Sequence, residues 1–141
     1  YGEYTKALKI IDQTENELIK LRGRSKWYEL YKETLTFNKG ICLGRLKKYR
    51  ASNNEIKEVL KKKPTNDIYI SWLEGNRASI FKQYSNFLAI IGAVLFLSIK
   101  IFDNDKQIVQ DFIFRESGII LIFLSVLFYY LAPYLVKIMK K

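Results

Sequence analysis

An uncharged stretch of nineteen residues, Gly118 to Val136, most strongly constrains what this chain can fold into. It reads GIILIFLSVLFYYLAPYLV and lies between the charged residues Glu116 and Lys137. An α-helix of this length rises by about 28 Å, which is close to the ~30 Å thickness of a bilayer's hydrocarbon core. The stretch therefore predicts a transmembrane helix over 118–136, with its tyrosines near one interface.

A second apolar stretch precedes this one and predicts another membrane helix. Residues 86–102 read NFLAIIGAVLFLSIKIF, but the uncharged part ends at Ile99 and has only fourteen residues. Lys100 can extend its ammonium group to the interface, so we expect residues 77–102 to form a linker and the first transmembrane helix. A buried or re-entrant helix is the alternative. The small side chains expected to allow close helix packing are Gly92, Ala93, Ser98 and Ser125.

The fifteen residues between the two stretches, 103–117, carry two basic and four acidic side chains. A loop this short requires antiparallel helices. Five basic residues lie near the outer ends of the hairpin, among them those of a basic tail over 137–141, against two in the loop. The positive-inside rule therefore places both termini in the cytoplasm. The apolar residues of the loop fit either a short helix at the outer interface or a continuation of the second membrane helix.

The net charge of +10 is unevenly distributed along the chain. Residues 1–85 hold 18 basic and 10 acidic side chains, hence +8, whereas residues 86–141 hold six and four, hence +2. The chain has no His and one Cys, Cys42, which excludes histidine-dependent catalysis, His-containing metal sites and an intramolecular disulfide. No residue pattern indicates catalysis, so we expect a non-enzymatic protein without cofactor or metal. Because the chain begins with Tyr1 rather than Met, we also expect a fragment or processed product.

The first 85 residues predict helices throughout, because Pro occurs only once there and no stretch alternates apolar and polar residues. We expect helices over about 3–21 and 26–43, a third after residue 52 and a fourth after residue 66, which either ends near residue 75 or continues into the membrane. The apolar residues expected to pack are Leu8, Ile11, Leu18 and Leu21 in the first helix and Trp27, Leu30, Tyr31, Leu35 and Ile41 in the second.

Local signals indicate where these helices begin and end. Ser25 is the expected N-cap of the second helix, and Gly44 marks the turn after it. Ser52 with Glu55 fits a capping box at the start of the third helix. Asn66 is the expected cap of the fourth helix.

Residues 2–7, GEYTKA, resemble the Gly-x-Tyr-x-x-Ala turn and second-helix start of a tetratricopeptide repeat. The segment CLGRLKKY, followed by a helix and Pro64, is similar to the same portion of a later repeat, with Gly44 at the turn. Tyr49 stands where the family has a small Ala, and the two glycines are 42 residues apart rather than about 34. The resemblance covers residues 2–64 and implies paired helices that bind peptides or partner helices. An unrelated helical bundle is the alternative.

Two clusters of basic residues remain: Arg45, Lys47, Lys48 and Arg50, and Lys61, Lys62 and Lys63. Anionic lipid headgroups would attract such residues near a membrane at about 1 kcal/mol each, which makes lipid the first interpretation. A solvated face without a specific partner is the second. Nucleic acid is the least favoured, because the aromatic residues have the spacing of a helical core.

The sequence thus predicts an all-α integral membrane protein. A cytoplasmic helical-hairpin bundle over 1–76, resembling tetratricopeptide repeats, is joined to a two-helix transmembrane hairpin. Its expected role is a membrane-anchored interaction module, an adaptor or accessory subunit with a protein partner on its cytoplasmic helices, in a bacterial plasma membrane. The alternatives are a membrane-perturbing or channel-like effector of a bacterial defence or toxin system, whose hairpin forms homo-oligomers, and an immunity or accessory subunit of a membrane complex.

Overall fold

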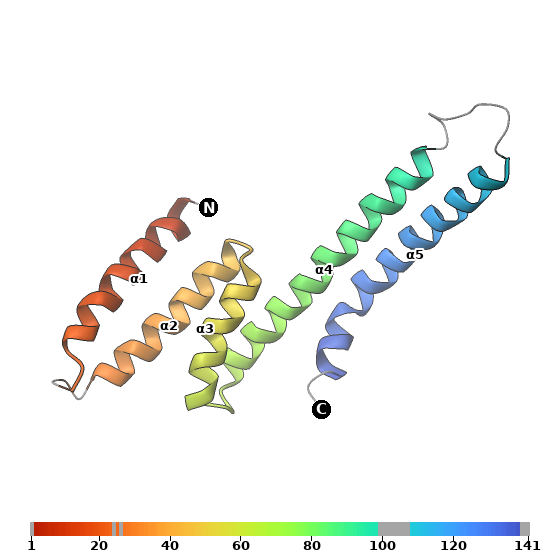
Figure 1. Ribbon diagram of the computed structural model, residues 1–141. Helices are drawn as coiled ribbons and strands as arrows, with labels where there is room; N and C mark the ends of the chain where they lie inside the picture. Colours follow the sequence, from red (N-terminus) through yellow and green to blue (C-terminus); the bar gives the residue numbers. More distant parts are fainter. Residues whose placement is uncertain (1, 24, 26, 99–107, 139–141) are drawn as a thin grey trace. The chain divides into compact units, whose positions relative to one another are not determined.

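The computed structural model describes residues 2–23, 25, 27–98 and 108–138, except for the side chains of residues 98, 108–114 and 137. These residues form five α-helices and no strand, which confirms the all-α prediction for this part of the chain (Figure 1). The helices are α1 (Gly2–Lys20), α2 (Tyr28–Arg45), α3 (Tyr49–Lys62), α4 (Asp67–Ser98) and α5 (Ile108–Ile138). The chain divides into two compact units, residues 1–77 and 78–141, here termed the polar unit and the hairpin unit.

The core of the polar unit forms where α2 packs against both α1 and α3. Its buried apolar side chains include Ile11, Cys42, Ile56 and Val59. Gly40 lets α2 pack closely against α3, because a Cβ atom there would lie 2.9 Å from Cγ1 of Ile56. A larger residue at this position would force the two helices apart.

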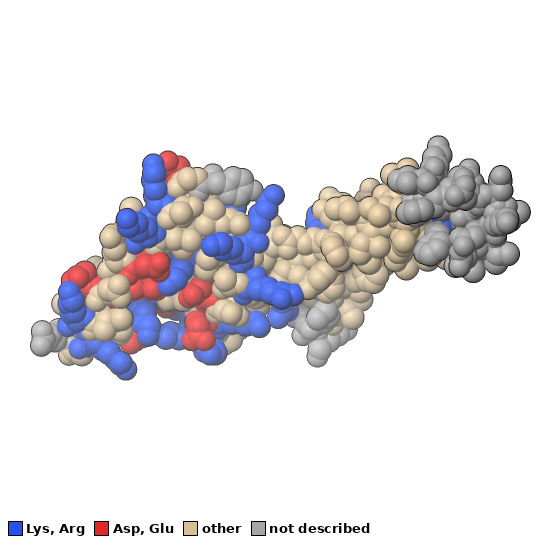
Figure 2. Space-filling model, turned by 45° about the horizontal axis from the view of Figure 1, so that its top comes forward, with Lys and Arg blue, Asp and Glu red and all other residues tan. Residues whose placement is uncertain are grey.

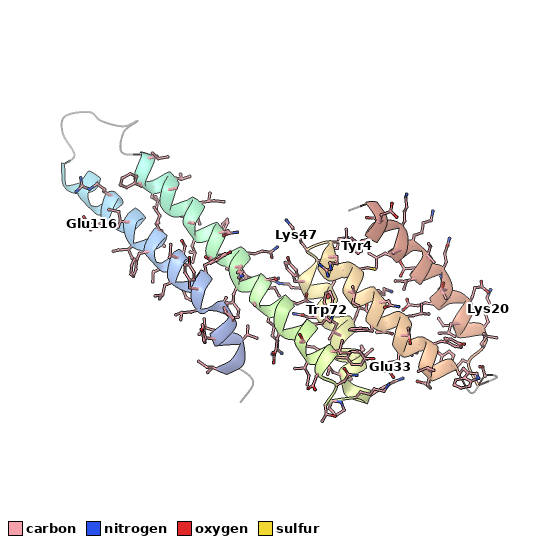
Figure 3. All side chains as sticks on the ribbon, turned by 180° about the vertical axis from the view of Figure 1, so that it is seen from behind. Tyr4, Lys20, Glu33, Lys47, Trp72 and Glu116 are labelled. Atoms are coloured by element: carbon pink, nitrogen blue, oxygen red, sulfur yellow. The ribbon has the colours of Figure 1, made fainter. Side chains whose placement is uncertain are left out.

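The first turns of α4 complete this core. The rings of Phe37 on α2 and Tyr69 on α4 have centroids 4.5 Å apart. The guanidinium of Arg45 lies 5.5 Å from the centroid of the Trp72 ring, a cation–π contact between the end of α2 and α4. Figure 3 shows Trp72 and Glu33 where α2 meets α4.

The predicted caps of α2 and α4 have different outcomes. Ser25 is not an N-cap, because α2 begins at Tyr28 and Trp27 holds the cap position without a side-chain capping bond. The Ser25 hydroxyl instead accepts the backbone N–H of Trp27 at 3.2 Å and stabilises the preceding turn. The Asn66 cap is confirmed: its Oδ1 accepts the backbone N–H groups of Ile68 and Tyr69 at 3.0 and 3.2 Å.

The turn after α2 is not made by Gly44, which lies inside the helix and is buried. The helix ends in a Schellman motif, in which the N–H of Lys48 bonds the carbonyl of Leu43 at 2.9 Å and the N–H of Lys47 bonds that of Gly44 at 3.0 Å. Lys47 therefore takes the left-handed conformation, with φ of 61°, that glycine usually supplies. The glycine to which the tetratricopeptide resemblance assigned a turn is thus a packing residue.

The capping box predicted at Ser52 is also wrong. Helix α3 begins at Tyr49, and Ser52 lies one turn inside it with no exposed surface. Its hydroxyl donates to the carbonyl of Gly40 at 2.6 Å and accepts the side-chain N–H of Asn76 at 2.7 Å. Ser52 therefore joins α2, α3 and α4.

Three residues expected to pack in the second helix are instead exposed. Trp27, Leu30 and Tyr31 expose 51%, 48% and 57% of their surface. The start of α2 instead turns Tyr28 inward, which exposes only 7% of its surface. Glu33 is buried further along the helix.

Helices α4 and α5 are both long and apolar enough to cross a membrane, over Asp67–Leu97 and Arg115–Val136. Helix α4 does not end near Gly75 but continues into the apolar stretch. Residues 108–117, assigned to the loop from the sequence, form the first turns of α5, so the loop's apolar residues continue the second helix. Residues 99–102, including Lys100, lie outside the described part of the chain.

Candidate membrane hairpin and basic clusters

Two glycines bring α4 and α5 into backbone contact in the hairpin unit. A Cβ atom at Gly92 would lie 2.8 Å from the carbonyl oxygen of Gly118 and 3.1 Å from the backbone nitrogen of Ile122. A Cβ atom at Gly118 would lie 2.9 Å from the carbonyl oxygen of Gly92 and 3.0 Å from the nitrogen of Phe96. Since the atoms met are largely backbone, no side-chain rotation can make room.

Two serines make the next contact along the hairpin. The Ser85 hydroxyl donates to the carbonyl of Ser125 at 2.5 Å, and both residues are buried. The Ser125 hydroxyl donates to the carbonyl of Ile122, one turn back in α5, at 2.7 Å. Both hydroxyl groups therefore have acceptors, as an apolar surrounding requires.

These contacts belong to a seven-residue repeat of small residues on each helix. Helix α4 carries Ala78, Ser85 and Gly92, and α5 carries Gly118, Ser125 and Ala132 in the reverse order. Because glycine faces glycine and serine faces serine, the same spacing places Ala78 opposite Ala132, which has no exposed surface. A seven-residue repeat keeps one side of a helix turned to its partner over several turns.

A cation–π contact continues the same register towards the end of α5. The ammonium group of Lys82 lies 4.9 Å from the centroid of the Tyr129 ring. The rings of Tyr129 and Tyr130 meet edge to face, with centroids 5.7 Å apart. A lysine and two tyrosines thus gather at one level of the hairpin.

The residues that the sequence suggested for helix packing fall in three groups. Gly92 and Ser125 lie in the contact between α4 and α5. Ala93 is half-buried, and the side chain of Ser98 lies outside the described residues. Gly118 and Ser85 were missed, although a search for small residues at seven-residue intervals in both apolar stretches would have found them.

The outward surface of the hairpin is apolar. Only 11% of the most apolar window of α4 and 17% of that of α5 is buried inside the protein, whereas the core helix of a soluble protein is mostly buried. Phe87, Ile90 and Val94 on α4 and Phe123 on α5 each expose 61% or more of their surface. Figure 2 shows Lys, Arg, Asp and Glu gathered over the polar unit, while the described surface of the hairpin consists mostly of other residues.

The basic cluster at the end of α3 is paired with carboxylates. Lys61 bonds Glu58 in the preceding turn, Lys62 bonds Glu29 on α2, and Lys63 bonds Glu33 on α2 at 2.7 Å. These contacts bind the end of α3 to the start of α2. The three lysines thus have an intramolecular role that the sequence did not indicate.

The other basic cluster lies around the turn between α2 and α3. Lys47 and Lys48 are exposed in this turn, and Arg50 is exposed in the first turn of α3. Arg45 is held over the Trp72 ring. The two clusters lie at opposite ends of α3 and do not form one continuous basic surface.

The Glu33 carboxylate is the most buried of the acidic groups that hold the polar unit together. Hydrogen bonds from Lys63 and from the Tyr69 hydroxyl, at 2.7 Å each, lower its pKa below the ordinary 4.5. Burial, together with the bond to Glu33, raises the pKa of Tyr69 to about 12. Tyr69 therefore stays protonated and donates to Glu33 throughout the physiological range.

A second charged group joins α1 to α2. The Lys39 ammonium lies 2.9 Å from Asp12 and 2.7 Å from Glu15. Burial alone would lower the pKa of Lys39, but the two carboxylates raise it by more. Burial raises the pKa of the nearby Glu55, on α3, above 4.5, and the carboxylates of Glu15 and Asp12 add to this.

Among the residues that the structure describes, no group of three or more His, Cys, Asp or Glu side chains could hold a metal ion. The thiol of Cys42 is buried, and this burial raises its pKa, so it is a poor nucleophile. No family model, no curated protein and no solved structure matches this chain.

Proposed function

We propose that this chain is a membrane-anchored interaction protein, whose α4–α5 hairpin crosses a bacterial plasma membrane and whose polar unit binds a protein partner without catalysis. The exposed apolar surface of both long helices carries the proposal. Exposed side chains such as Phe87 and Phe123 are suited to contact with lipid. In lipid the hydrophobic effect does not drive helices together, and small residues allow the close van der Waals packing that holds α4 against α5. The basic residues outside the hairpin support a cytoplasmic location for both termini.

The polar unit supports the binding role through apolar residues that its own core does not cover. On α1, Ile10 and Ile19 expose 61% and 60% of their surface, and Trp27, Leu30 and Tyr31 lie exposed at the start of α2. Exposed apolar side chains of this size favour contact with another protein. The tetratricopeptide-like interpretation belongs to this proposal and is supported by the packing of consecutive helices, α1 on α2 and α2 on α3.

Cysteine labelling in intact cells tests the topology. In a Cys42→Ala background, Asn104→Cys should react with an impermeant thiol reagent, whereas Asn54→Cys, at an exposed position of α3, should react only after the cells are opened. Labelling of Asn54→Cys alone in intact cells would overturn the proposed topology.

A second experiment separates an anchor from a channel. The purified protein in phospholipid vesicles should resist alkaline extraction and should not release an encapsulated dye. Dye release at low protein-to-lipid ratio would contradict the anchor and favour the channel-like alternative.

A third experiment tests the binding role. A photo-crosslinking residue at Tyr31 should give a discrete protein product in cells, and the same residue at Asn54 serves as the matched control. Equal products at both positions would contradict a binding surface at the start of α2.

A further inference from the structure

The contacts of the hairpin fix the register of α4 against α5. From Ser85 to Gly92 the chain advances seven residues along α4, and the facing residue on α5 moves seven back, from Ser125 to Gly118. The Lys82–Tyr129 contact agrees with this register to within one residue. The two helices are therefore antiparallel, and the position of either one relative to the other is known along the whole hairpin.

In this register the two uncharged stretches are not side by side. The first uncharged stretch begins at Gln83 and the second at Ser117, so in this register they overlap only over 83–93 and 117–127. Eleven residues of helix rise by about 16 Å, roughly half of the ~30 Å hydrocarbon core. The two stretches therefore cannot both define the membrane-embedded region.

Centring the bilayer on residues 118–136 of α5 has two costs. Lys82 and Gln83 of α4 would lie about 11 Å inside the hydrocarbon boundary, at the level of Tyr129. At the other face, Val94 and Leu97, which expose 61% and 55% of their surface, would lie at or beyond the boundary, in contact with headgroups or water. Lys82 would thus lie too deep for its ammonium group to reach the headgroups, and large apolar side chains would leave the core.

We infer that the hydrocarbon core covers residues 79–98 of α4 and 112–131 of α5, and that the rest of α5, to Ile138, lies among the lipid headgroups. Each covered segment is 20 residues, or about 30 Å, long. Lys82 then lies about 5 Å from the cytoplasmic boundary, within reach of the headgroups. Arg115 and Glu116 lie about 5 Å from the opposite boundary. This inference rests on the proposed membrane anchor and specifies its depth.

The side chains at the cytoplasmic boundary suit this depth. Tyr129 and Tyr130 lie within about 4 Å of it, where amphipathic aromatic residues are enriched in membrane proteins. Tyr130, Tyr134 and Ile138 follow one another at four-residue intervals, on one side of α5, and expose 71%, 64% and 68% of their surface. They carry the lipid-facing surface of α5 through the headgroup layer, so phospholipid headgroups are the partner of this end of the helix.

Spin-label depth measurements test the inference on the full chain in phospholipid vesicles. Single-cysteine variants in the Cys42→Ala background would carry labels at exposed positions, Phe123 and Leu127 on α5 and Ile90 and Val94 on α4. Collision with oxygen and with a water-soluble nickel complex reports the depth of each label. We expect Phe123 to lie about 6 Å deeper than Leu127, and Ile90 about 6 Å deeper than Val94.

Each other outcome contradicts a specific statement. A deepest label at Leu127 would place the bilayer on residues 118–136, and a deepest label at Val94 would place it on residues 86–102; either result overturns the inferred depth while keeping the anchor. Labels that all collide with the nickel complex as in water would show that the hairpin is not inserted, and the proposed function would fail with it.

Discussion

The close backbone contact at Gly92 leads to a prediction for Gly92→Ala that can be compared with the same substitution at Gly75, elsewhere in α4. Gly92→Ala places a methyl group 2.8 Å from the carbonyl oxygen of Gly118, where ordinary van der Waals contact begins near 3.4 Å. The two backbones must therefore move apart by about 0.6 Å. Such overpacking costs about 1–3 kcal/mol, because neighbouring contacts lengthen together. That range corresponds to a loss of roughly 5- to 150-fold in the equilibrium between packed and separated helices.

Gly75→Ala is the matched control. Gly75 also lies inside α4, but a Cβ atom there meets nothing within 4 Å. The substitution should stabilise the helix by about 0.5–1 kcal/mol, because alanine loses less backbone freedom on folding than glycine. The same chemical change is thus expected to weaken the packing of α4 against α5 at residue 92 and to leave that packing unchanged at residue 75.

The assay follows helix separation in mixed micelles. Spin labels at Phe87 and Phe123, which are exposed and lie at the same level, report the distance between α4 and α5 as the fraction of SDS is raised. Gly92→Ala should separate the helices at a lower SDS fraction. Adding Gly118→Ala should cost less than the two single changes together, because the first methyl group already moves the helices apart. A Gly92→Ala variant as stable as the parent chain would refute the close packing.

Three further predictions concern the polar unit, followed by tryptophan fluorescence, since both tryptophans lie in that unit. Lys47→Gly should stabilise it by about 0.5–1 kcal/mol, because a lysine in the left-handed region is strained; a lower unfolding temperature would contradict the turn described. Asn76→Ala should destabilise it by about 1–3 kcal/mol by leaving the Ser52 hydroxyl with one partner fewer, and a neutral result would argue against that bond. Because the pKa of Glu33 is lower in the folded chain than in the unfolded one, stability should be lost as the pH falls below about 4.5 towards its folded value. Glu33→Gln should reduce this acid sensitivity, and a denaturation profile unchanged by that substitution would assign the sensitivity to other groups.

Local chemistry made some features of this chain predictable. The Asn66 cap was predictable because its side chain bonds only backbone N–H groups two and three residues further along the chain. The long uncharged runs required apolar helices whatever the rest of the chain does. In both cases the deciding interactions lie within a few residues of each other.

Long-range contacts decided the features that were missed. Ser52 and Glu55 have the spacing of a capping box, but Ser52 is held inside α3 by Gly40 and Asn76, which lie 12 and 24 residues away. Gly44 was expected in a turn, yet a Cβ atom there would lie 3.1 Å from the Asn76 side chain, so close packing explains it. The ion pairs of Lys62 and Lys63 were likewise not predictable from the sequence, because their partners Glu29 and Glu33 lie on α2, about 30 residues away.

The bond between Asn76 and Ser52 also has a consequence for the order in which the chain is made. Helix α2 contains Gly40 and Gly44, which weaken an isolated helix, so it depends on α3 and α4 to close against it. Asn76 is synthesised only ten residues before Asn86, where the apolar stretch begins. The residue that completes the polar core and the apolar stretch of the proposed membrane anchor therefore leave the ribosome almost together, as parts of one helix. With the proposed anchor, folding of the polar unit and insertion of the hairpin become nearly simultaneous events.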